Sequence, residues 1–325
     1  MINILIALVV LLIIAALVQI TRVSELLSEI KNQDVNKVTD DDNKMQGVLF
    51  LVIGFGFLAF VVWQMVTWDH LLLPPASSLH GAEIDSLMKV SMGLILAVFF
   101  LLTPTLFFFV YKYRGNQKNT AYFFSHNNKL EVVWTVVPTI ILTVLIVYGL
   151  RTWDRSMNPD ISEAKVIEVY AQQFNWKARF SGDDNKLGRA NYTLVDSKNV
   201  LGVDMNDEYA LDDKLVREVH LVVGKPVLLK FRSQDVIHSA FLPHFRVQMN
   251  CVPGLSTQFA FTPTQTTAEM KNQEGEEFEF ILLCNKICGA AHYNMQMTFI
   301  VETQKEYDNW IASKKDLSEK LLTQK

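Results

Sequence analysis

The sequence predicts a membrane-anchored α+β protein, in which transmembrane helices precede a small β-sandwich or barrel. Half of the 325 residues are hydrophobic, and they gather mainly in the first half of the chain. Four long apolar runs lie in that half, whereas the rest carries short alternating segments separated by turn residues. We therefore expect a membrane anchor over residues 1–150 and an outer domain over residues 151–325.

The four apolar runs have the length of membrane-spanning helices. They cover residues 4–20, 47–68, 90–111 and 132–150. None carries a charge, and each is close to the about 20 residues with which a helix crosses a bilayer. Buried helices of a soluble protein are the alternative, but four uncharged runs exceed what a soluble core needs. The first run could be a signal peptide, yet no basic residue precedes it, so we predict a retained helix.

Basic residues beside these runs predict the orientation of the helices. Two connecting loops are basic, with Arg22, Lys31, Lys37 and Lys44 in one, and Lys112, Arg114, Lys118 and Lys129 in the other. Residues 69–88, between the second and third runs, contain no Lys or Arg. Because Lys and Arg concentrate in cytoplasmic loops, we expect a multi-pass protein of the cell inner (cytoplasmic) membrane. Residues 151–325 would then lie on the periplasmic, outer side.

The composition of the outer domain excludes some classes of function. From Arg151 onward, 21 Lys and Arg stand against 24 Asp and Glu, and no basic stripe indicates binding of nucleic acid. All three cysteines lie in this domain and are too few for a disulfide scaffold. The sequence has no CxxCH motif, so we do not expect a fused c-type cytochrome.

Short alternating segments predict the strands of the outer domain. They cover residues 165–180, 218–231, 257–262, 276–283 and 298–302. The Asp- and Asn-rich stretch 181–214 is expected to be a long excursion on the surface. An amphipathic pattern over residues 305–322 predicts a closing helix packed on the sheet.

Four side chains that can bind a metal follow one another closely near the end of the chain. They are Cys284, Cys288, His292 and Met295, with Gly289 allowing a sharp turn behind the second cysteine. Thiolate and thioether are soft ligands, which favour copper over magnesium or calcium. A zinc site, a Cys284–Cys288 disulfide and a core role for Met295 stay open, because spacing alone does not exclude them.

A further imidazole, His238, belongs to a motif that resembles a known family. The segments DVIHS (235–239), PHFRVQMNCVPG (243–254) and CNKICGAAHYNM (284–295) closely resemble subunit II of the haem-copper cytochrome c oxidases. Residues 130–150 resemble the second membrane helix of that family. The outer domain of such subunits is cupredoxin-like and holds a binuclear copper centre called CuA.

The resemblance implies a ligand for each position of that centre. Cys284 and Cys288 would be the thiolates that bridge two copper ions. His238 and Met295 would complete one copper, and His292 with the backbone carbonyl of Lys286 would complete the other. Two coppers that share two thiolates spread one electron over both ions, which favours fast electron transfer.

The family function implied is that of the electron-entry subunit of a terminal respiratory oxidase, an oxidoreductase. The centre would accept electrons from a cytochrome c type donor and pass them to haem in subunit I, where oxygen is reduced to water. Haem and CuB are expected only in the partner subunit. Oxidase subunit I and further membrane subunits are the expected partners.

Three positions depart from the usual family pattern or have two interpretations. Lys286 stands where the family usually has a Glu that also contributes to a magnesium site shared with subunit I. An ammonium group is itself a cation and has no lone pair to offer a metal ion, so we expect that magnesium site to be absent or built differently. Phe174 stands where the family has the tryptophan that receives electrons. Trp176 follows as a possible conduit or, equally, as a core residue of a strand.

The membrane half departs from the family too. The family minimum is one helical hairpin, so the first two spans are additional, and we expect them to contact neighbouring subunits. Glu131 matches the family glutamate near the entrance of a proton path into subunit I. A charge at a helix start that is favoured by the helix dipole is an equally good interpretation.

Rival functions make different predictions. A quinol oxidase subunit II has the same fold without copper, but that branch lacks the cysteines present here. A membrane-anchored copper chaperone or sensor would need an open, exchangeable site, so copper lability on dialysis discriminates it. A nitrous oxide reductase with CuA would need a large propeller domain and no helical anchor.

Overall fold

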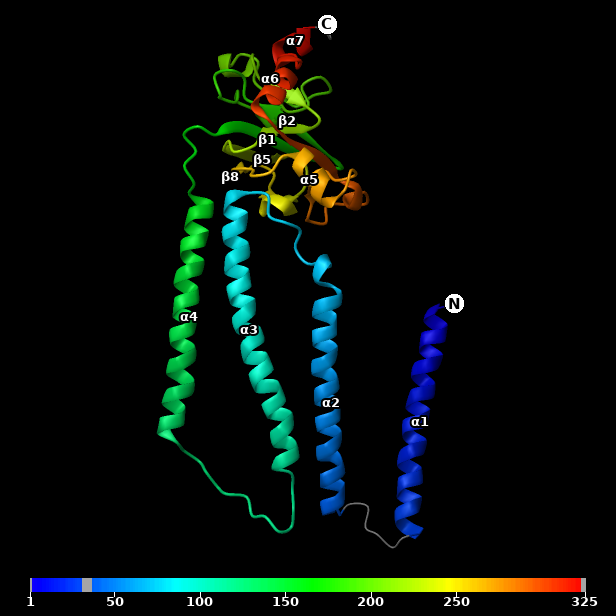
Figure 1. The fold of residues 1–325 in the computed structure, drawn as a ribbon. Coiled ribbons are helices and arrows are strands. Elements are labelled where there is room, and N and C mark those ends of the chain that lie inside the picture. Colours follow the sequence, from blue (N-terminus) through cyan, green and yellow to red (C-terminus); the bar gives the residue numbers. More distant parts are fainter. Residues whose placement is uncertain (1, 31–36, 323–325) are drawn as a thin grey trace. The chain divides into compact units, whose positions relative to one another are not determined.

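A computed structural model describes residues 2–30 and 37–322, and Figure 1 traces their elements in order. By its contacts the chain divides into two units, Met1–Thr67 with Ile95–Asn127, and Trp68–Leu94 with Asn128–Lys325. Lys31, one of the basic residues used for the orientation, lies outside the described residues.

Four long helices match the four predicted apolar runs, except that Trp68, the last residue of the second run, follows the helix. They are α1 (Ile2–Ile30), α2 (Asp40–Thr67), α3 (Leu79–Lys112) and α4 (Asn128–Met157), and all are long and apolar enough to cross a membrane. Each extends into polar flanks that the uncharged runs left out. At 1.5 Å per residue, the 34 residues of α3 span about 51 Å, more than the about 30 Å of a bilayer core. Helix α3 is therefore long enough for its polar first turns to lie outside the hydrocarbon core.

In the first unit, α2 packs closely against the second half of α3. A Cβ placed on Gly54 would lie 2.3 Å from Cγ of Phe107, so only glycine leaves room for that ring. One end of the contact is fixed by the backbone N–H of Gln117, which donates to Oδ1 of Asp40 at 3.0 Å. Small residues at such a contact let two membrane helices approach each other.

The outer domain is a sandwich of two five-stranded sheets, ordered β3-β2-β1-β5-β8 and β4-β10-β9-β6-β7. The strands of the first sheet are β1 (Lys165–Gln172), β2 (Asn175–Phe180), β3 (Lys214–Val216), β5 (Val227–Ser233) and β8 (Thr257–Phe261). Those of the second are β4 (Val219–Val222), β6 (His238–Leu242), β7 (Val247–Cys251), β9 (Phe280–Cys284) and β10 (Gln296–Glu302). The predicted fold class is confirmed.

Side-chain alternation explains how the sheets face each other. On β1, Ile167, Val169 and Ala171 point into the core between the sheets and are fully buried. The predicted segment 165–180 forms the hairpin β1–β2, with Gln172 opposite Asn175. Short β3, β6 and β7 were not predicted as strands, and neither was α5 (Thr267–Glu274) as a helix.

The closing helix forms as two pieces, α6 (Gln304–Ala312) and α7 (Leu317–Leu322). The first begins with a capping box, in which Thr303 and Glu306 each accept a backbone N–H of the other. The expected single helix over residues 305–322 is therefore interrupted between Ala312 and Leu317.

The polar stretch 181–214 is not merely the surface excursion that was expected. Leu201, Val203 and Ala210 are buried with Tyr170, which points away from the sandwich core. The stretch thus covers the outer face of the first sheet. Glu168 and Tyr170, which lie on that face, are buried beneath it.

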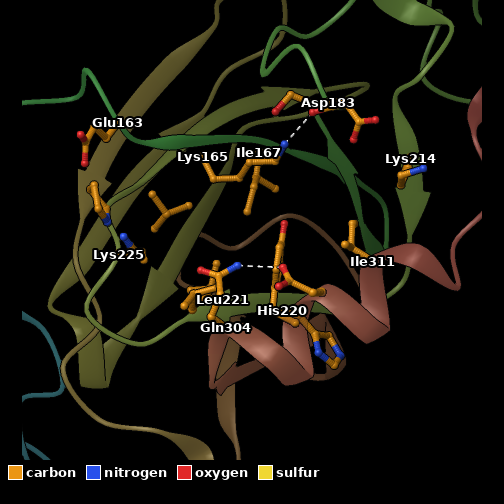
Figure 2. Close-up of a pocket in the computed structure, with 17 residues that line it drawn as sticks. Glu163, Lys165, Ile167, Asp183, Lys214, His220, Leu221, Lys225, Gln304 and Ile311 are labelled. Carbon is orange, nitrogen blue, oxygen red and sulfur yellow. Dashed lines mark hydrogen bonds between the residues drawn. The ribbon is translucent and has the colours of Figure 1, made fainter.

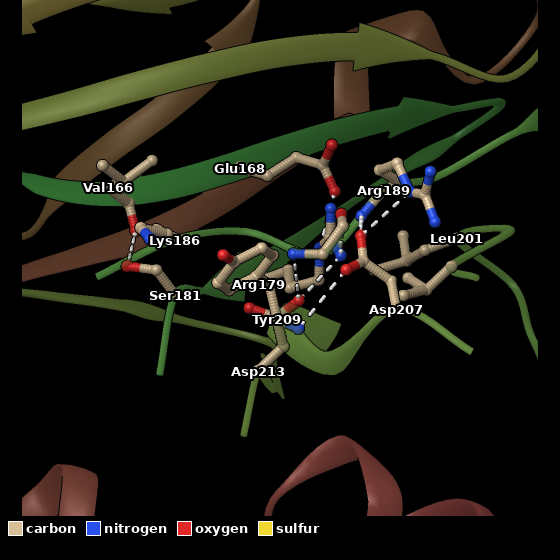
Figure 3. A network of polar contacts seen from close by, with 12 residues as sticks. Val166, Glu168, Arg179, Ser181, Lys186, Arg189, Leu201, Asp207, Tyr209 and Asp213 are labelled. Carbon is tan, nitrogen blue, oxygen red and sulfur yellow. Dashed lines mark hydrogen bonds and ion pairs between the residues drawn. The ribbon is translucent and has the colours of Figure 1, made fainter. Parts of the chain in front are cut away.

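A buried network of charges joins this stretch to the first sheet (Figure 3). The Arg179 guanidinium donates to Oε2 of Glu168 at 3.0 Å, to Oδ2 of Asp213 at 2.8 Å and to the Gly188 carbonyl at 2.9 Å. Arg232 donates to the other oxygen of Glu168 at 2.5 Å. Arg179 and Asp213 are 2% and 0% exposed, so each charge depends on its partners.

Arg246 fastens the segment before α3, and the first turns of α3 itself, to the β-sandwich. Its guanidinium donates to both carboxylate oxygens of Asp85 at 2.8 Å and to the Pro74 carbonyl at 2.6 Å. Ser77 is buried, and its N–H donates to the carbonyl of His244 at 2.7 Å. These contacts explain why residues 68–94 belong to the same unit as the outer domain.

Candidate metal centre

The second sheet brings the candidate ligands together at one end. His238 begins β6, Cys284 ends β9, and Met295 directly precedes β10. Strands β6 and β9 are neighbours, with Ala240 opposite Cys284. Cys288 and His292 lie in the connection from β9 to β10, which folds back because the two strands are antiparallel.

The donor atoms of these side chains lie in mutual contact. Sγ of Cys284 is 3.8 Å from Sγ of Cys288, 3.8 Å from Nδ1 of His238 and 3.2 Å from the carbonyl oxygen of Lys286. Sγ of Cys288 is 3.5 Å from Nδ1 of His292 and 3.9 Å from Sδ of Met295. Ligands bound at about 2.0–2.3 Å in a tetrahedral site are separated by distances of this size.

The two imidazoles approach different thiols. The ligand atoms of His238, Cys284 and Cys288 all lie within 4.8 Å of one another. His292 is not a member of that set, although its Nδ1 contacts Sγ of Cys288. The thiol pair thus has an imidazole at each end.

The chemistry of the donor set fits copper. Two sulfur atoms, a thioether, two imidazole nitrogens and a carbonyl oxygen face one another, and all of them offer lone pairs once the thiols ionise. With the thiols ionised, these donor atoms need a cation between them. Because thiolate and thioether prefer soft metals, the residues present fit a copper centre.

Asp235 orients His238 from outside the ligand group. Its Oδ1 is 2.9 Å from Nε2 of His238, so Nε2 carries the proton and Nδ1 is left free as a ligand. Burial raises the pKa of Asp235, but hydrogen bonds from the Gln173 N–H and from His238 outweigh burial and lower it overall. Asp235 therefore remains a carboxylate beside the site.

Burial sets the protonation of the Cys288 thiol. The pKa of Cys288 is raised to about 11, mainly by burial and to a smaller extent by the hydrogen bond with Cys284 and the charge of Cys284. Without metal, Cys288 is thus a neutral thiol at pH 7, and a metal must displace its proton to bind. Metal binding at this site is accordingly expected to weaken as pH falls.

The third cysteine, Cys251, is a buried neighbour outside the donor group. It lies on β7 opposite His238 and is 0% exposed. Burial raises its pKa to about 12. It packs in the hydrophobic core, as expected for a small apolar side chain.

The remaining predicted residues lie at different depths. Trp176 is 5% exposed, its Nε1–H donates to the Met295 carbonyl at 3.3 Å, and its ring is 6.0 Å from that of His238. Phe174 is half-buried against the core, the side chain of Lys286 is exposed, and Glu131 lies exposed in the first turn of α4. The roles predicted for these residues stay predictions.

Two residues beside the site were missed by the sequence analysis. Asp235 could have been found, because it stands three residues before His238 within the quoted DVIHS segment. Gln173 donates from Nε2 to the carbonyl of Cys288 at 2.5 Å, across 115 residues of sequence. No local pattern signals a contact over that separation.

A separate cavity of about 390 Å³ lies between β1, β4 and α6 (Figure 2). None of the candidate ligands lines it. Its lining mixes Lys165 and Lys225 with Glu163 and Asp183, and Lys165 already donates to the Gly182 carbonyl at 2.7 Å. Mixed charges of this kind give no preference for one class of ligand.

Comparison with known proteins agrees with this fold. The family description "cytochrome c oxidase subunit II, transmembrane domain" matches residues 66–152, and the corresponding periplasmic domain matches residues 165–303. The chain belongs to the subunit II family of haem-copper cytochrome c oxidases. The predicted family is confirmed, and the protein is a membrane-anchored subunit of an oxidoreductase.

Several subunit II relatives resemble the chain over most of its length. Alternative cytochrome c oxidase subunit 2 of Bradyrhizobium diazoefficiens is 27% identical over 270 residues, which are 82% of this chain and 91% of that protein. Cytochrome c oxidase subunit 2 of Synechocystis is 25% identical over 288 residues, 82% of each. The solved periplasmic domain of subunit II from Bradyrhizobium japonicum is 22% identical, with a TM-score of 0.33, and covers 47% of this chain and 96% of its own.

Proposed function

We propose that this subunit II is the electron-entry subunit of a terminal respiratory oxidase and that it holds a binuclear CuA centre. Electrons come from a cytochrome c type donor and go on to haem in subunit I, where oxygen is reduced to water. The observation that carries the proposal is the pair of thiols 3.8 Å apart with an imidazole nitrogen against each of them.

Each ligand residue has a defined task in this proposal. Cys284 and Cys288 bridge two copper ions, His238 and Met295 complete one, and His292 with the Lys286 carbonyl completes the other. Because the last ligand belongs to the main chain, Lys at position 286 is compatible with the centre. When bound, the copper pair supplies a carrier of one electron at a time.

The surroundings of the ligands suit a permanent centre rather than an exchangeable one. His238 and Met295 are 0% and 1% exposed, and Cys288 is 6% exposed. Ligands also come from two separate segments, which would have to part before the metal could leave. These features favour an electron carrier over a copper chaperone.

The proposal places the chain in the cell inner membrane with its outer domain on the periplasmic side. Haem and CuB belong to subunit I in this account, and α1 and α2 provide contacts to further membrane subunits. Glu131 is proposed at the entrance of a proton path. Phe174 lies against the Cys288 loop and is the better candidate than buried Trp176 for the donor side.

Electron transfer in the assembled oxidase tests this function. The oxidase is mixed with a reduced cytochrome c type donor, and haem reduction is followed by rapid-mixing absorption spectroscopy. We expect Cys284→Ser to abolish haem reduction by the donor, because neither copper would keep both bridges. Reduction by a small-molecule mediator should persist in the same variant.

Cys251→Ala is the matched control, because Cys251 is a buried cysteine of the same domain outside the donor group. It should reduce haem at the wild-type rate. Unchanged haem reduction by the donor in Cys284→Ser would contradict the electron-entry role.

A further inference from the structure

The hairpin turn between β1 and β2 lies on the first sheet, yet it contacts both ligand-bearing segments of the second. Its two turn residues are Gln173 and Phe174, because Gln172 pairs with Asn175. The candidate ligands all belong to β6, β9 and the connection to β10. The turn is therefore a link between the sheets at the end where the donor group lies.

Gln173 makes a separate hydrogen bond to each segment. Its backbone N–H donates to Oδ2 of Asp235 at 2.7 Å, while Oδ1 of the same carboxylate contacts Nε2 of His238 at 2.9 Å. Its side-chain Nε2 donates to the carbonyl of Cys288 at 2.5 Å. One residue thus connects an imidazole ligand with a bridging cysteine that lies 50 positions further along the chain.

Close packing supports the same link. A Cβ on Gly289 would lie 2.7 Å from the Phe174 ring and 2.9 Å from Nε2 of Gln173. The residue after Cys288 must therefore be glycine for the turn to reach the cysteine carbonyl. Gly289 also has φ +144°, which other residues rarely adopt.

We propose that Gln173 is a positioning residue, which fixes Cys288 relative to His238 and thereby sets the copper affinity and spectrum of the centre. The inference rests on the proposed copper function. The two hydrogen bonds act on different atoms, so a side-chain substitution removes the bond to Cys288 and keeps the backbone bond to Asp235. Partners outside the ligand set typically change metal affinity by about 10–100-fold. Because Gln173 itself is exposed, we expect the lower end, about tenfold.

The test compares copper(I) binding by the full-length chain and its variants, in competition with a chromophoric chelator. Gln173→Leu removes the donor, and Gln173→Glu keeps the shape but replaces the amide with an acceptor. Gln172→Leu is the control, since the neighbouring Gln172 accepts from Lys177 at 2.7 Å instead. We expect about tenfold weaker copper(I) binding in both Gln173 variants and, after oxidation of the copper-loaded chain with ferricyanide, an altered copper hyperfine pattern, with Gln172→Leu like wild type.

A second readout does not depend on copper. In the reduced, metal-free chain, Cys288 should be alkylated faster in both Gln173 variants than in wild type, because its loop has lost a tether. Wild-type copper affinity and alkylation rate in folded Gln173 variants would overturn the positioning role. If the wild-type chain held no copper, the proposed function would fail, and the alkylation rates alone would decide the role of Gln173.

Discussion

The two sheets of the outer domain bury polar side chains in contrasting ways. In the first sheet, positive and negative groups pair with one another, with Arg179 between Glu168 and Asp213. In the second sheet, Cys284, Cys288 and their neighbouring imidazoles face one another with lone pairs only. The first arrangement is electrically complete within the chain, whereas the second becomes complete when a cation binds.

This difference separates stability from function within one sandwich. The ion-pair network fastens the polar stretch 181–214 over the outer face of the first sheet. The donor group lies at an end of the second sheet, and the first sheet contacts it through the turn at Gln173 and through Trp176 on β2. Substitutions in the network should therefore affect folding, and substitutions in the donor group should affect metal binding.

The largest effect on stability is expected for Arg179→Ala. It leaves the buried Asp213 carboxylate without its cationic partner and leaves Glu168 with Arg232 alone, and breaking a buried ion pair typically costs about 3–5 kcal/mol. Urea unfolding of the outer domain within the detergent-solubilised chain measures this loss. The copper spectrum of the folded fraction should stay that of wild type. Arg217→Ala, at an exposed arginine, is the control. A changed copper spectrum with unchanged stability would reverse the assignment of the two sheets.

A smaller effect, dependent on pH, is expected for Asp213→Asn. Burial raises the pKa of Asp213 from 3.8 to about 6, so the folded state holds a proton that the unfolded state has released. This contribution to stability is fully present below about pH 4 and is lost as pH rises through about 6. A shift of about two units corresponds to about 3 kcal/mol at most.

The neighbouring Glu168 acts in the opposite direction and in a lower pH range. Burial raises its pKa, but Arg179 and Arg232 outweigh burial and hold it below 4.5. Glu168 therefore titrates below pH 4.5 and Asp213 above it. As pH rises from 4.5 to 7, the melting temperature of wild type should fall relative to that of Asp213→Asn. Asp183→Asn, at an exposed position, should follow wild type. Parallel curves for Asp213→Asn and wild type would remove Asp213 from this account.

The smallest effect on the copper centre is expected for Lys286→Glu. The side chain is exposed and only the main-chain carbonyl contacts Cys284, so copper content and spectrum should not change. The new carboxylate restores the ligand type that the family uses for magnesium. Manganese, used as a paramagnetic probe in the assembled oxidase, should bind to this variant and not to wild type or Lys286→Gln. A loss of copper would show that the lysine side chain supports the centre.

Much of the fold could be predicted from the sequence, because its signals are local. Uncharged runs located all four long helices, and alternation located the hairpin 165–180. The stretch 181–214 was misjudged because its few apolar residues, such as Leu201 and Val203, have no periodicity. Their burial depends on an outward-facing Tyr170 from a distant strand.

The candidate site could likewise be predicted only in part from the sequence. Spacing from Cys284 to Met295 indicated a metal but left zinc and a disulfide open, and only the family resemblance supplied His238 and the copper assignment. The structure keeps both cysteines as free thiols with donors around them. Gln173 and the Arg246–Asp85 pair could not be predicted, because contacts between distant segments leave no local pattern.

The most direct test of the central claim is the metal content of the purified full-length chain, together with its electron paramagnetic resonance spectrum. The account predicts two copper ions per chain and one unpaired electron shared equally by both copper nuclei, with both features absent in Cys284→Ser. One tightly held zinc ion, or a spectrum confined to a single copper nucleus, would contradict the binuclear centre.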